Sequence, residues 1–270
     1  FHGQTVFHDP SKHISIQLGD PYLLSKMLKT KVVYQFRKAD LIKNGQGAPI
    51  APIYHKEIIN KLDIEHPAVI VNIGGISNLT YIDKRKLIGF DTGPGNNYMD
   101  FFMQNNFNKS FDNKGLYAKL GTPNHDLIKK FCDDVFFKKT PPKSLERSKL
   151  FENQIYKQIL LLDPLDSMAT LCLLTAETIK KGFQLLPKKV KTTIIVGGGQ
   201  NNCFLIDQLE KTLNSKVYSA KTLNLPGNFI EAELIAFLAA RRIHNLPSTF
   251  PTTTGVKSKT VIGEIVDFKS

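Results

Sequence analysis

Two glycine-rich segments carry the residues of this sequence that could do chemistry, and each follows a run of β-forming residues. Residues 91–96 read Asp-Thr-Gly-Pro-Gly-Asn, and residues 197–202 read Gly-Gly-Gly-Gln-Asn-Asn. Glycine lets backbone N–H groups come close to phosphates, and the N-terminus of a following helix favours their negative charge. Asp91 stands at the carboxyl end of its predicted strand, where a carboxylate could order Mg²⁺ or accept a proton from an attacking hydroxyl or water.

These residues also have plainer interpretations. Neither segment matches a Walker A loop or a G-x-G-x-x-G loop, so each could be a tight turn, and Asp91 could cap one. His2 and His8 could form a metal pair, although a polar pocket or an ordinary loop is the better interpretation. No serine lies in a G-x-S-x-G setting, which argues against a serine hydrolase.

The elements that must position these segments follow an α/β pattern. The first 66 residues mix short strands and helices, and the character changes after His66-Pro67. The run at 68–73 is almost entirely β-branched or apolar, as in a central strand that is buried on both faces. Further strands are predicted at 78–82, 87–90 and 192–196, and the main helices at 167–184, 203–213 and 230–244. We therefore expect one unit at residues 1–66 and a second at 67–270.

Composition narrows the class of protein. The 270 residues include 36 Lys and Arg against 24 Asp and Glu, a net charge of +12, but only five of the basic residues are Arg. Because nucleic-acid readers depend on Arg and aromatic contacts, scattered Lys favours a Lys-rich background over a nucleic-acid partner. The three cysteines (Cys132, Cys172 and Cys203) are too far apart for a CxxC site and favour a reducing, cytoplasmic setting. No apolar run is long enough for a membrane span.

Several sequence motifs resemble those of the anhydro-N-acetylmuramic acid kinases. They are HGQT at 2–5, QLGD at 17–20, FRKAD at 36–40, GQGAP at 45–49, NIGGISNLT at 72–80, FDTGPGN at 90–96 and VGGGQNN at 196–202. The matches keep their order along the whole chain, and the GQGAP and FDTGPGN motifs are the most specific of them.

The resemblance implies an actin-like ATPase (ribonuclease H-like) fold of two α/β domains that close on ATP. It implies that the chain uses ATP and Mg²⁺ to phosphorylate 1,6-anhydro-N-acetylmuramic acid. Water opens the anhydro ring in the same reaction, which gives N-acetylmuramic acid 6-phosphate for peptidoglycan recycling in the cytoplasm. Phosphoryl transfer needs positioning and charge neutralisation more than covalent help, which agrees with the residues present.

Roles carry over by motif. Asp91 would be the general base that activates the water, and it is also the predicted metal contact. The predicted nucleotide-binding residues are Thr92, Gly93, Gly95 and Asn96 toward the phosphates, and Gly197, Gly198, Gly199 and Asn202 at adenosine. The predicted sugar contacts are His2, Gln4, Arg37 and Glu231. Arg37 is an isolated Arg in a Lys-rich chain, which fits a planar polar partner better than a solvated surface.

The chain also departs from the family pattern. The family begins with a glycine-rich GTSxDG loop. The counterpart of Phe1 lies about a quarter of the way along the full family sequence, after that loop. We therefore expect residues 1–66 to be the remainder of a first domain. Leu145 and Glu146 replace a Thr-Gly pair of the family, and Gln35 replaces an Asp.

These departures leave three hypotheses. The chain is an active kinase, with a separate N-terminal chain or a homodimer as partner. Alternatively it is a catalytically impaired remnant or a split-gene half of that kinase. The weakest alternative is a basic nucleic-acid-binding module, which only the net charge of +12 favours.

Overall fold

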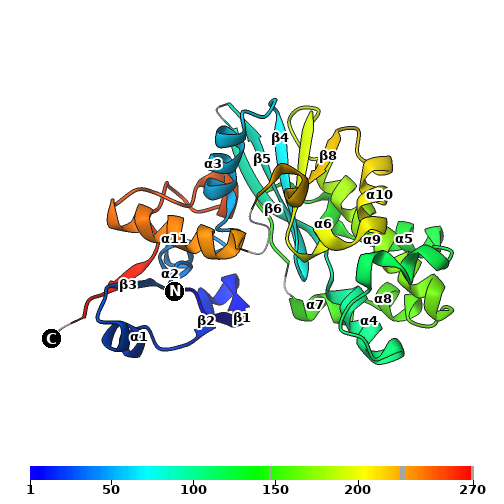
Figure 1. Cartoon of the computed structure of the whole chain (residues 1–270), viewed down its shortest axis with the longest axis horizontal. Coiled ribbons are helices and arrows are strands. Elements are labelled where there is room, and N and C mark those ends of the chain that lie inside the picture. Colours follow the sequence, from blue (N-terminus) through cyan, green and yellow to red (C-terminus); the bar gives the residue numbers. More distant parts are fainter. Residues whose placement is uncertain (85, 146, 226–228, 269–270) are drawn as a thin grey trace.

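The structure, a computed structural model, describes residues 1–84, 86–145, 147–225 and 229–268. It has two parts: a five-stranded sheet with its helices, and a smaller part in which both ends of the chain lie together (Figure 1). Glu146, one of the replaced residues, lies outside the described residues.

The central sheet has the strand order β6-β5-β4-β7-β8. Its strands are β4 (Ala68–Ile73), β5 (Ile76–Asp83), β6 (Lys86–Pro94), β7 (Thr192–Val196) and β8 (Lys216–Ser219). The pairs β4–β5 and β5–β6 are antiparallel, whereas β4–β7 and β7–β8 are parallel. Three antiparallel strands followed by two parallel ones are the topology of a ribonuclease H-like domain, so the predicted actin-like fold is confirmed.

The sheet is covered on both faces because its strands present alternate residues to opposite sides. Val69 and Val71 of β4 belong to a large apolar cluster with the long helix α9 (Pro164–Phe183). Ile70 and Ile194 point to the opposite face, where they pack with Ile59 of α3 (Pro52–Leu62). Burial on both sides explains why β4 is nearly free of polar residues.

The remaining helices of the larger part gather on the α9 side of the sheet (Figure 1). They are α4 (Asn97–Phe107), α5 (His125–Cys132), α6 (Val135–Lys138), α7 (Arg147–Glu152), α8 (Gln154–Ile159) and α10 (Cys203–Thr212). Short 3₁₀ turns are found at Pro10–Lys12, Asn113–Gly115, Ala118–Leu120, Gly198–Asn201 and Ala220–Leu223.

The smaller part joins the two ends of the chain. The hairpin of β1 (Gln4–Asp9) and β2 (Ile14–Leu18) precedes α1 (Pro21–Leu28), and β3 (Val32–Tyr34) pairs with β9 (Glu264–Val266). The other helices are α2 (Lys38–Ile42), α11 (Ile230–Ile243) and α12 (Pro251–Thr254). A division of the chain between residues 66 and 67 would therefore separate α11 and β9 from α3 and β3, on which they pack.

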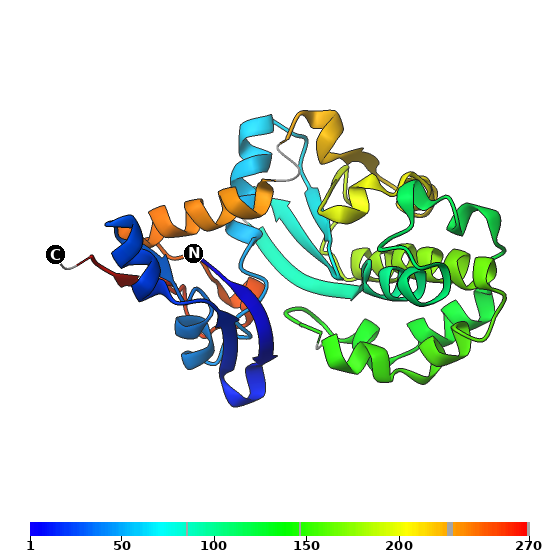
Figure 2. The ribbon, with the colours of Figure 1, turned by 60° about the horizontal axis from the view of Figure 1, so that its bottom comes forward.

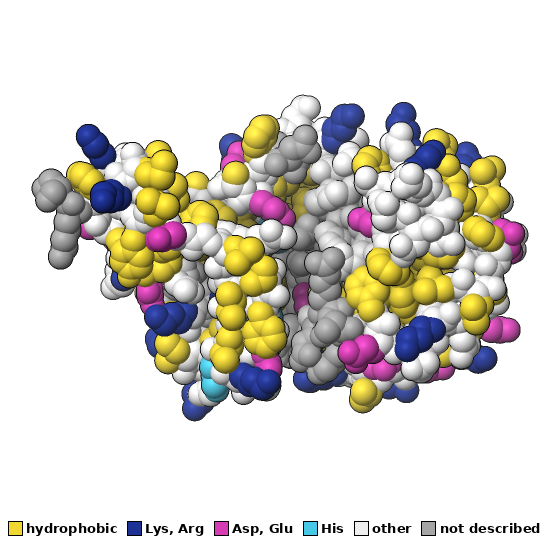
Figure 3. Space-filling model, turned by 90° about the horizontal axis from the view of Figure 1, so that it is seen from below, with side chains coloured by type: hydrophobic (Ala, Val, Ile, Leu, Met, Phe, Trp, Pro, Cys, Tyr) yellow, Lys and Arg dark blue, Asp and Glu magenta, His cyan; other side chains and the backbone are white. Residues whose placement is uncertain are grey.

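Seen from below, hydrophobic side chains gather on the smaller part beside the opening between the two parts (Figure 3). Val6 and Phe7 of the hairpin are about half exposed. Among the described residues, no helix is long and apolar enough to cross a membrane. The cysteines are free; Cys132 and Cys172 are buried and Cys203 is exposed.

We predict that Ile70→Ala destabilises the protein by about 2–5 kcal/mol, because this fully buried side chain of β4 leaves a cavity that the two-sided packing cannot close. Urea unfolding followed by circular dichroism measures the free energy of unfolding. Ile42→Ala is the matched control, because Ile42 is 65% exposed and its truncation should change stability little. An equal loss in both variants would contradict the assignment of β4 to the core.

Candidate active site

The site lies at one edge of the central sheet, where strands β4, β6 and β7 all end. These strands run in the same direction, so their carboxyl ends bring together the Gly74-Gly75 turn, residues 91–96 and residues 197–199. Asn96 Nδ2 donates to Ile73 O at 3.1 Å, and a Cβ on Gly198 would lie 3.3 Å from the same amide nitrogen. The two glycine-rich segments of the sequence are therefore neighbours in space.

Asp91 lies near the end of β6 with only 8% of its surface exposed. Its Oδ2 accepts a hydrogen bond of 2.8 Å from the Leu145 N–H, and its own N–H donates to Lys143 O at 3.0 Å. Burial raises the pKa of Asp91 to about 6, while the Leu145 N–H and the charges of Arg37 and Lys143 oppose the rise. A carboxylate with this pKa can take up a proton near neutral pH.

Arg37 faces Asp91 across a cavity of about 770 Å³. One guanidinium nitrogen, Nη1, donates to Gly47 O at 3.1 Å, whereas the buried Nε has no partner among the described residues. Burial lowers the pKa of Arg37 and Asp91 opposes this effect. A buried donor without a protein acceptor, in the wall of a cavity, indicates a polar ligand.

The cavity is built from segments that are far apart in the sequence. In Figure 2 the hairpin β1–β2 and the loop ahead of α7 lie next to each other, below the strands of the central sheet. The residues that line the cavity are Thr5, Val6, Phe7, His8, Asp9, Arg37, Ala48, Pro49, Ile50, Ala51, Asn72, Ile76, Asn78, Asp91, Leu145 and Phe151. Apolar walls with a few convergent polar groups are typical of a small-molecule site.

Lys143 adds a buried cation behind Asp91. Its side chain is 2% exposed, its Nζ donates to Phe136 O at 2.8 Å, and the ammonium lies 4.3 Å from the centre of the Phe136 ring. Burial lowers the pKa of Lys143 to about 8, and the nearby Lys139 acts in the same direction. Lys143, two residues before Leu145, therefore contributes to the electrostatic field at Asp91.

The predicted phosphate segment is more ordered than the sequence suggests. The strand β6 continues through Pro94, and the N–H groups of Gly95 and Asn96 donate to Gly75 O and Gly74 O at 3.0 and 2.7 Å. The Thr92 hydroxyl donates to Ser77 Oγ at 2.8 Å. In this structure the adjacent glycine turn therefore accepts the N–H groups of Gly95 and Asn96, and the roles of Thr92, Gly93, Gly95 and Asn96 toward the phosphates remain predictions.

Glycine is required at two positions of this edge. A Cβ on Gly95 would lie 2.2 Å from Gly74 O, so the two turns could not approach each other. Gly197 has φ of 79°, and a Cβ there would lie 2.4 Å from the side chain of Asn72. Gly93 packs against Thr178 of α9 and Gly199 against Ile73, so both serve close packing.

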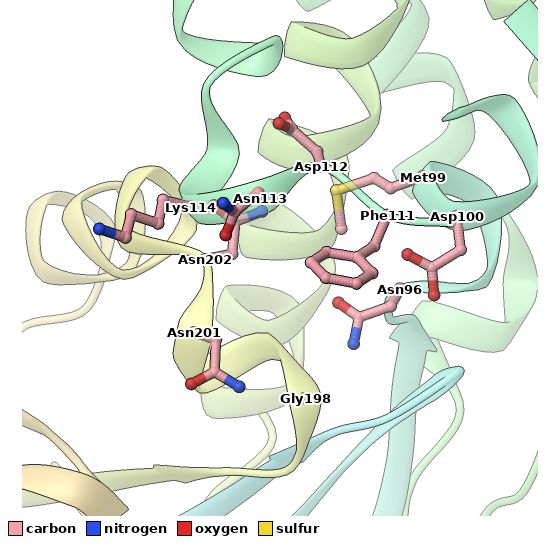
Figure 4. A pocket seen from close by; sticks show the side chains of 10 residues that line it. All are labelled: Asn96, Met99, Asp100, Phe111, Asp112, Asn113, Lys114, Gly198, Asn201 and Asn202. Carbon is pink, nitrogen blue, oxygen red and sulfur yellow. The ribbon is translucent and has the colours of Figure 1, made fainter. Parts of the chain in front are cut away.

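A second pocket of about 240 Å³ lies beside the glycine segments (Figure 4). It is lined by Asn96, Met99, Asp100, Phe111, Asp112, Asn113, Lys114, Gly198, Asn201 and Asn202. It thus unites three predicted nucleotide-binding residues, Asn96, Gly198 and Asn202. Asn202 also caps α10, with its side chain accepting the Leu205 N–H at 3.0 Å.

Three predicted sugar contacts lie away from the lining of the larger cavity. Gln4 is exposed on β1, and Glu231 is exposed in the first turn of α11. His2 packs near Phe36, its Nδ1 is buried without a partner in the described part of the chain, and burial, with Arg37 adding to it, lowers its pKa to about 4. Their roles in sugar binding remain predictions.

Sequence reasoning missed several residues that line these cavities. Asn72 and Asn78 face each other across β4 and β5 and line the larger cavity, and Asp100 and Phe111 line the smaller one. Asn72 carried a usable signal, because it is the single polar residue in an otherwise apolar run. Burial raises the pKa of Asp100 to about 6, but its sequence context, the first turn of a helix, gave no indication of a pocket.

Comparison with known protein sequences points to one family. A family model described as anhydro-N-acetylmuramic acid kinase matches residues 1–267. A relative of that name from Bradyrhizobium diazoefficiens is 40% identical over 258 residues, covering 95% of this chain and 69% of the relative. One from Zymomonas mobilis is 36% identical over 267 residues, covering 98% and 72%. Among solved structures, the activator of the 2-hydroxyisocaproyl-CoA dehydratase from Clostridium difficile with bound ADPNP aligns with a TM-score of 0.44 and 14% identity, covering 71% of this chain and 67% of that one.

Proposed function

This chain belongs to the anhydro-N-acetylmuramic acid kinase family, and from that membership we propose how its two cavities divide the reaction. The protein is a sugar kinase, a phosphotransferase that uses ATP to convert 1,6-anhydro-N-acetylmuramic acid into N-acetylmuramic acid 6-phosphate in peptidoglycan recycling. In our proposal the larger cavity holds the sugar and the smaller pocket holds adenosine. The cytoplasm, where ATP is available, is the proposed location.

One observation supports the sugar site above all others. Arg37 and Asp91 come from the two parts of the chain and line one cavity: Asp91 is buried, Arg37 is half-buried, and the buried Arg37 Nε has no acceptor among the described residues. An oxygen-rich sugar with a carboxylate supplies the acceptors that Arg37 needs. Asn72 and Asn78 offer further polar contacts on the opposite wall.

The proposed reaction begins at Asp91. Its carboxylate takes a proton from a water molecule, the water oxygen bonds to the anomeric carbon, and the bond from that carbon to O6 breaks. The freed O6 then attacks the γ-phosphate of ATP and ADP leaves. A pKa near 6 suits this step, because the carboxylate is largely ionised at neutral pH and still basic enough to accept the proton.

Mg²⁺ is proposed as the companion of ATP. Among the described residues there is no group of three or more His, Cys, Asp or Glu that could hold a metal ion. Magnesium in kinases is held by one or two carboxylates together with phosphates and water, so one carboxylate such as Asp91 fits it. Its chemistry would be to neutralise charge on the phosphates.

The direct test is an assay with 1,6-anhydro-N-acetylmuramic acid and ATP, in which mass spectrometry detects the 6-phosphate and a coupled assay detects ADP. In ¹⁸O-labelled water one label should enter the sugar and none the phosphate. ADP formation that does not depend on the sugar would contradict the proposal.

The same assay separates the alternatives about partners. The alignments cover 69% to 72% of the relatives, so the segment that these relatives carry outside the alignment can be added as a separate chain. Activity only after this addition would support a partner chain. A folded protein that is inactive in both cases would support the impaired remnant. Light scattering would detect a homodimer.

We predict that Phe111→Ala raises the KM for ATP about tenfold or more without loss of stability. The Phe111 ring is 59% exposed, lies in the smaller pocket, and offers a surface on which adenine can stack, an interaction of about 1–3 kcal/mol. Steady-state kinetics at saturating sugar measure the change. Leu120→Ala is the control, because Leu120 is also exposed, at 73%, but lies outside the pocket. An unchanged KM would place adenine elsewhere.

A further inference from the structure

A buried cluster outside both cavities connects Arg37 to the C-terminal turn α12. The Asp40 carboxylate accepts the Gly47 N–H at 2.7 Å through Oδ1 and the Thr254 hydroxyl at 2.6 Å through Oδ2. Asp40 and Thr254 are both fully buried. Gly47 in turn offers the carbonyl that accepts Arg37 Nη1. Asp40 therefore holds Gly47, the residue whose carbonyl orients the guanidinium.

The same turn also reaches the loop that holds Asp91. Thr254 O accepts the Gln46 N–H at 2.7 Å, and Gln46 Nε2 donates to Pro142 O at 3.4 Å. Gly255 lies directly against the Pro142 ring. Pro142 precedes Lys143 and Leu145, whose backbone groups bond Asp91. Thr254 therefore connects the loop that holds Arg37 with the loop that holds Asp91.

We propose that Asp40 and Thr254 form a buried clamp that sets the position of Arg37 relative to Asp91. Neither side chain lines the cavity, so both are positioning residues. The proposal rests on the proposed function, because it assumes that Arg37 and Asp91 act on one substrate. Hydrogen bonds to a buried carboxylate are strong and directional, and the loss of one lets both loops relax.

Thr254→Val tests the clamp, because it removes the hydroxyl and keeps the shape of the side chain. Because Gly47 would no longer be held in place, Arg37 Nη1 should lose its hydrogen bond to the Gly47 carbonyl. NMR of the Arg37 guanidinium N–H groups in ¹⁵N-arginine-labelled protein, assigned with Arg37→Lys, detects this loss without substrate.

We expect a shifted and faster-exchanging Arg37 guanidinium signal in Thr254→Val and about tenfold weaker sugar binding by calorimetry, as for one lost hydrogen bond to a charged group. Thr254→Ser should restore both values. Thr253→Val is the matched control, since among the described residues the Thr253 hydroxyl bonds only to the Phe250 backbone; it should lower the melting temperature and leave the Arg37 signal unchanged.

Asp40→Asn, which has the same shape, should change the Arg37 signal in the same way and serves if Thr254→Val does not fold. An unchanged Arg37 signal and sugar affinity in a folded clamp variant would overturn the proposal. Because the Arg37 signal needs neither substrate nor turnover, failure of the clamp is distinct from failure of the proposed function, which would appear as no sugar binding by the unmodified protein.

Discussion

Asp91→Asn is expected to reduce sugar phosphorylation by about three orders of magnitude, within the range of rate that a positioned general base contributes. Asparagine keeps the size of the side chain and can still accept the Leu145 N–H, but it cannot take a proton from water. Formation of ADP and of the sugar 6-phosphate at saturating substrates measures the loss in kcat.

The control for this variant is Asp126→Asn, which removes the same charge from an exposed position in the first turn of α5. It should retain full activity. If Asp91→Asn retained more than a tenth of the rate, another group would have to activate the water. The sugar affinity of Asp91→Asn should change far less than its rate.

The raised pKa of Asp91 gives the pH dependence a definite sign. The base must be ionised, so the rate should be constant above pH 7 and fall about tenfold per pH unit below about 6. The stability of the fold should instead increase as the pH falls. The folded pKa lies above the ordinary value of 3.8, so the buried carboxylate destabilises the fold above pH 6, and this cost disappears below pH 4. Asp91→Asn should therefore be more stable than the unmodified protein at pH 8, by at most about 3 kcal/mol.

Local sequence patterns were sufficient to predict the central sheet. The apolar run at 68–73 and the Thr192–Val196 run could only be buried strands, and both are central in the sheet. The extension of β6 through Asp91–Pro94 was missed because glycine and proline indicate a loop. Pairing with Ser77 and bonds to the Gly74-Gly75 turn outweigh that local preference.

Contacts between distant segments could not be predicted. The pairing of β3 with β9 joins residues near 33 and 265, and no local pattern encodes such a partner. The larger cavity likewise depends on the approach of the β1–β2 hairpin and Leu145 to Asp91. The motifs predicted roles for Arg37 and Asp91, whereas the burial of Lys143 and the Asp40–Thr254 bond became visible only in the structure.

Substitution of Arg37 is expected to have the second large effect on activity, and two variants can separate the contribution of its charge from that of its geometry. Arg37→Gln removes the charge and is expected to lower kcat/KM by about two orders of magnitude or more, because it leaves the buried Asp91 carboxylate without the stronger of its two cationic neighbours. The acid limb of the pH profile should move to higher pH. Arg242→Gln is the matched control, since that guanidinium also bonds a backbone carbonyl, Gly263 O at 2.7 Å, outside the lining of the cavity.

Arg37→Lys keeps the charge but loses the planar fork. The acid limb should therefore stay near its original pH, while the KM for the sugar rises, because an ammonium cannot bond Gly47 O and a substrate oxygen with the geometry of a guanidinium. If Lys restored both the pH profile and the KM, Arg37 would act only through its charge, and its free Nε would not be a substrate contact. If Gln left the pH profile unchanged, Lys143 alone would set the field at Asp91, and the sugar would have to be held by the asparagines of β4 and β5.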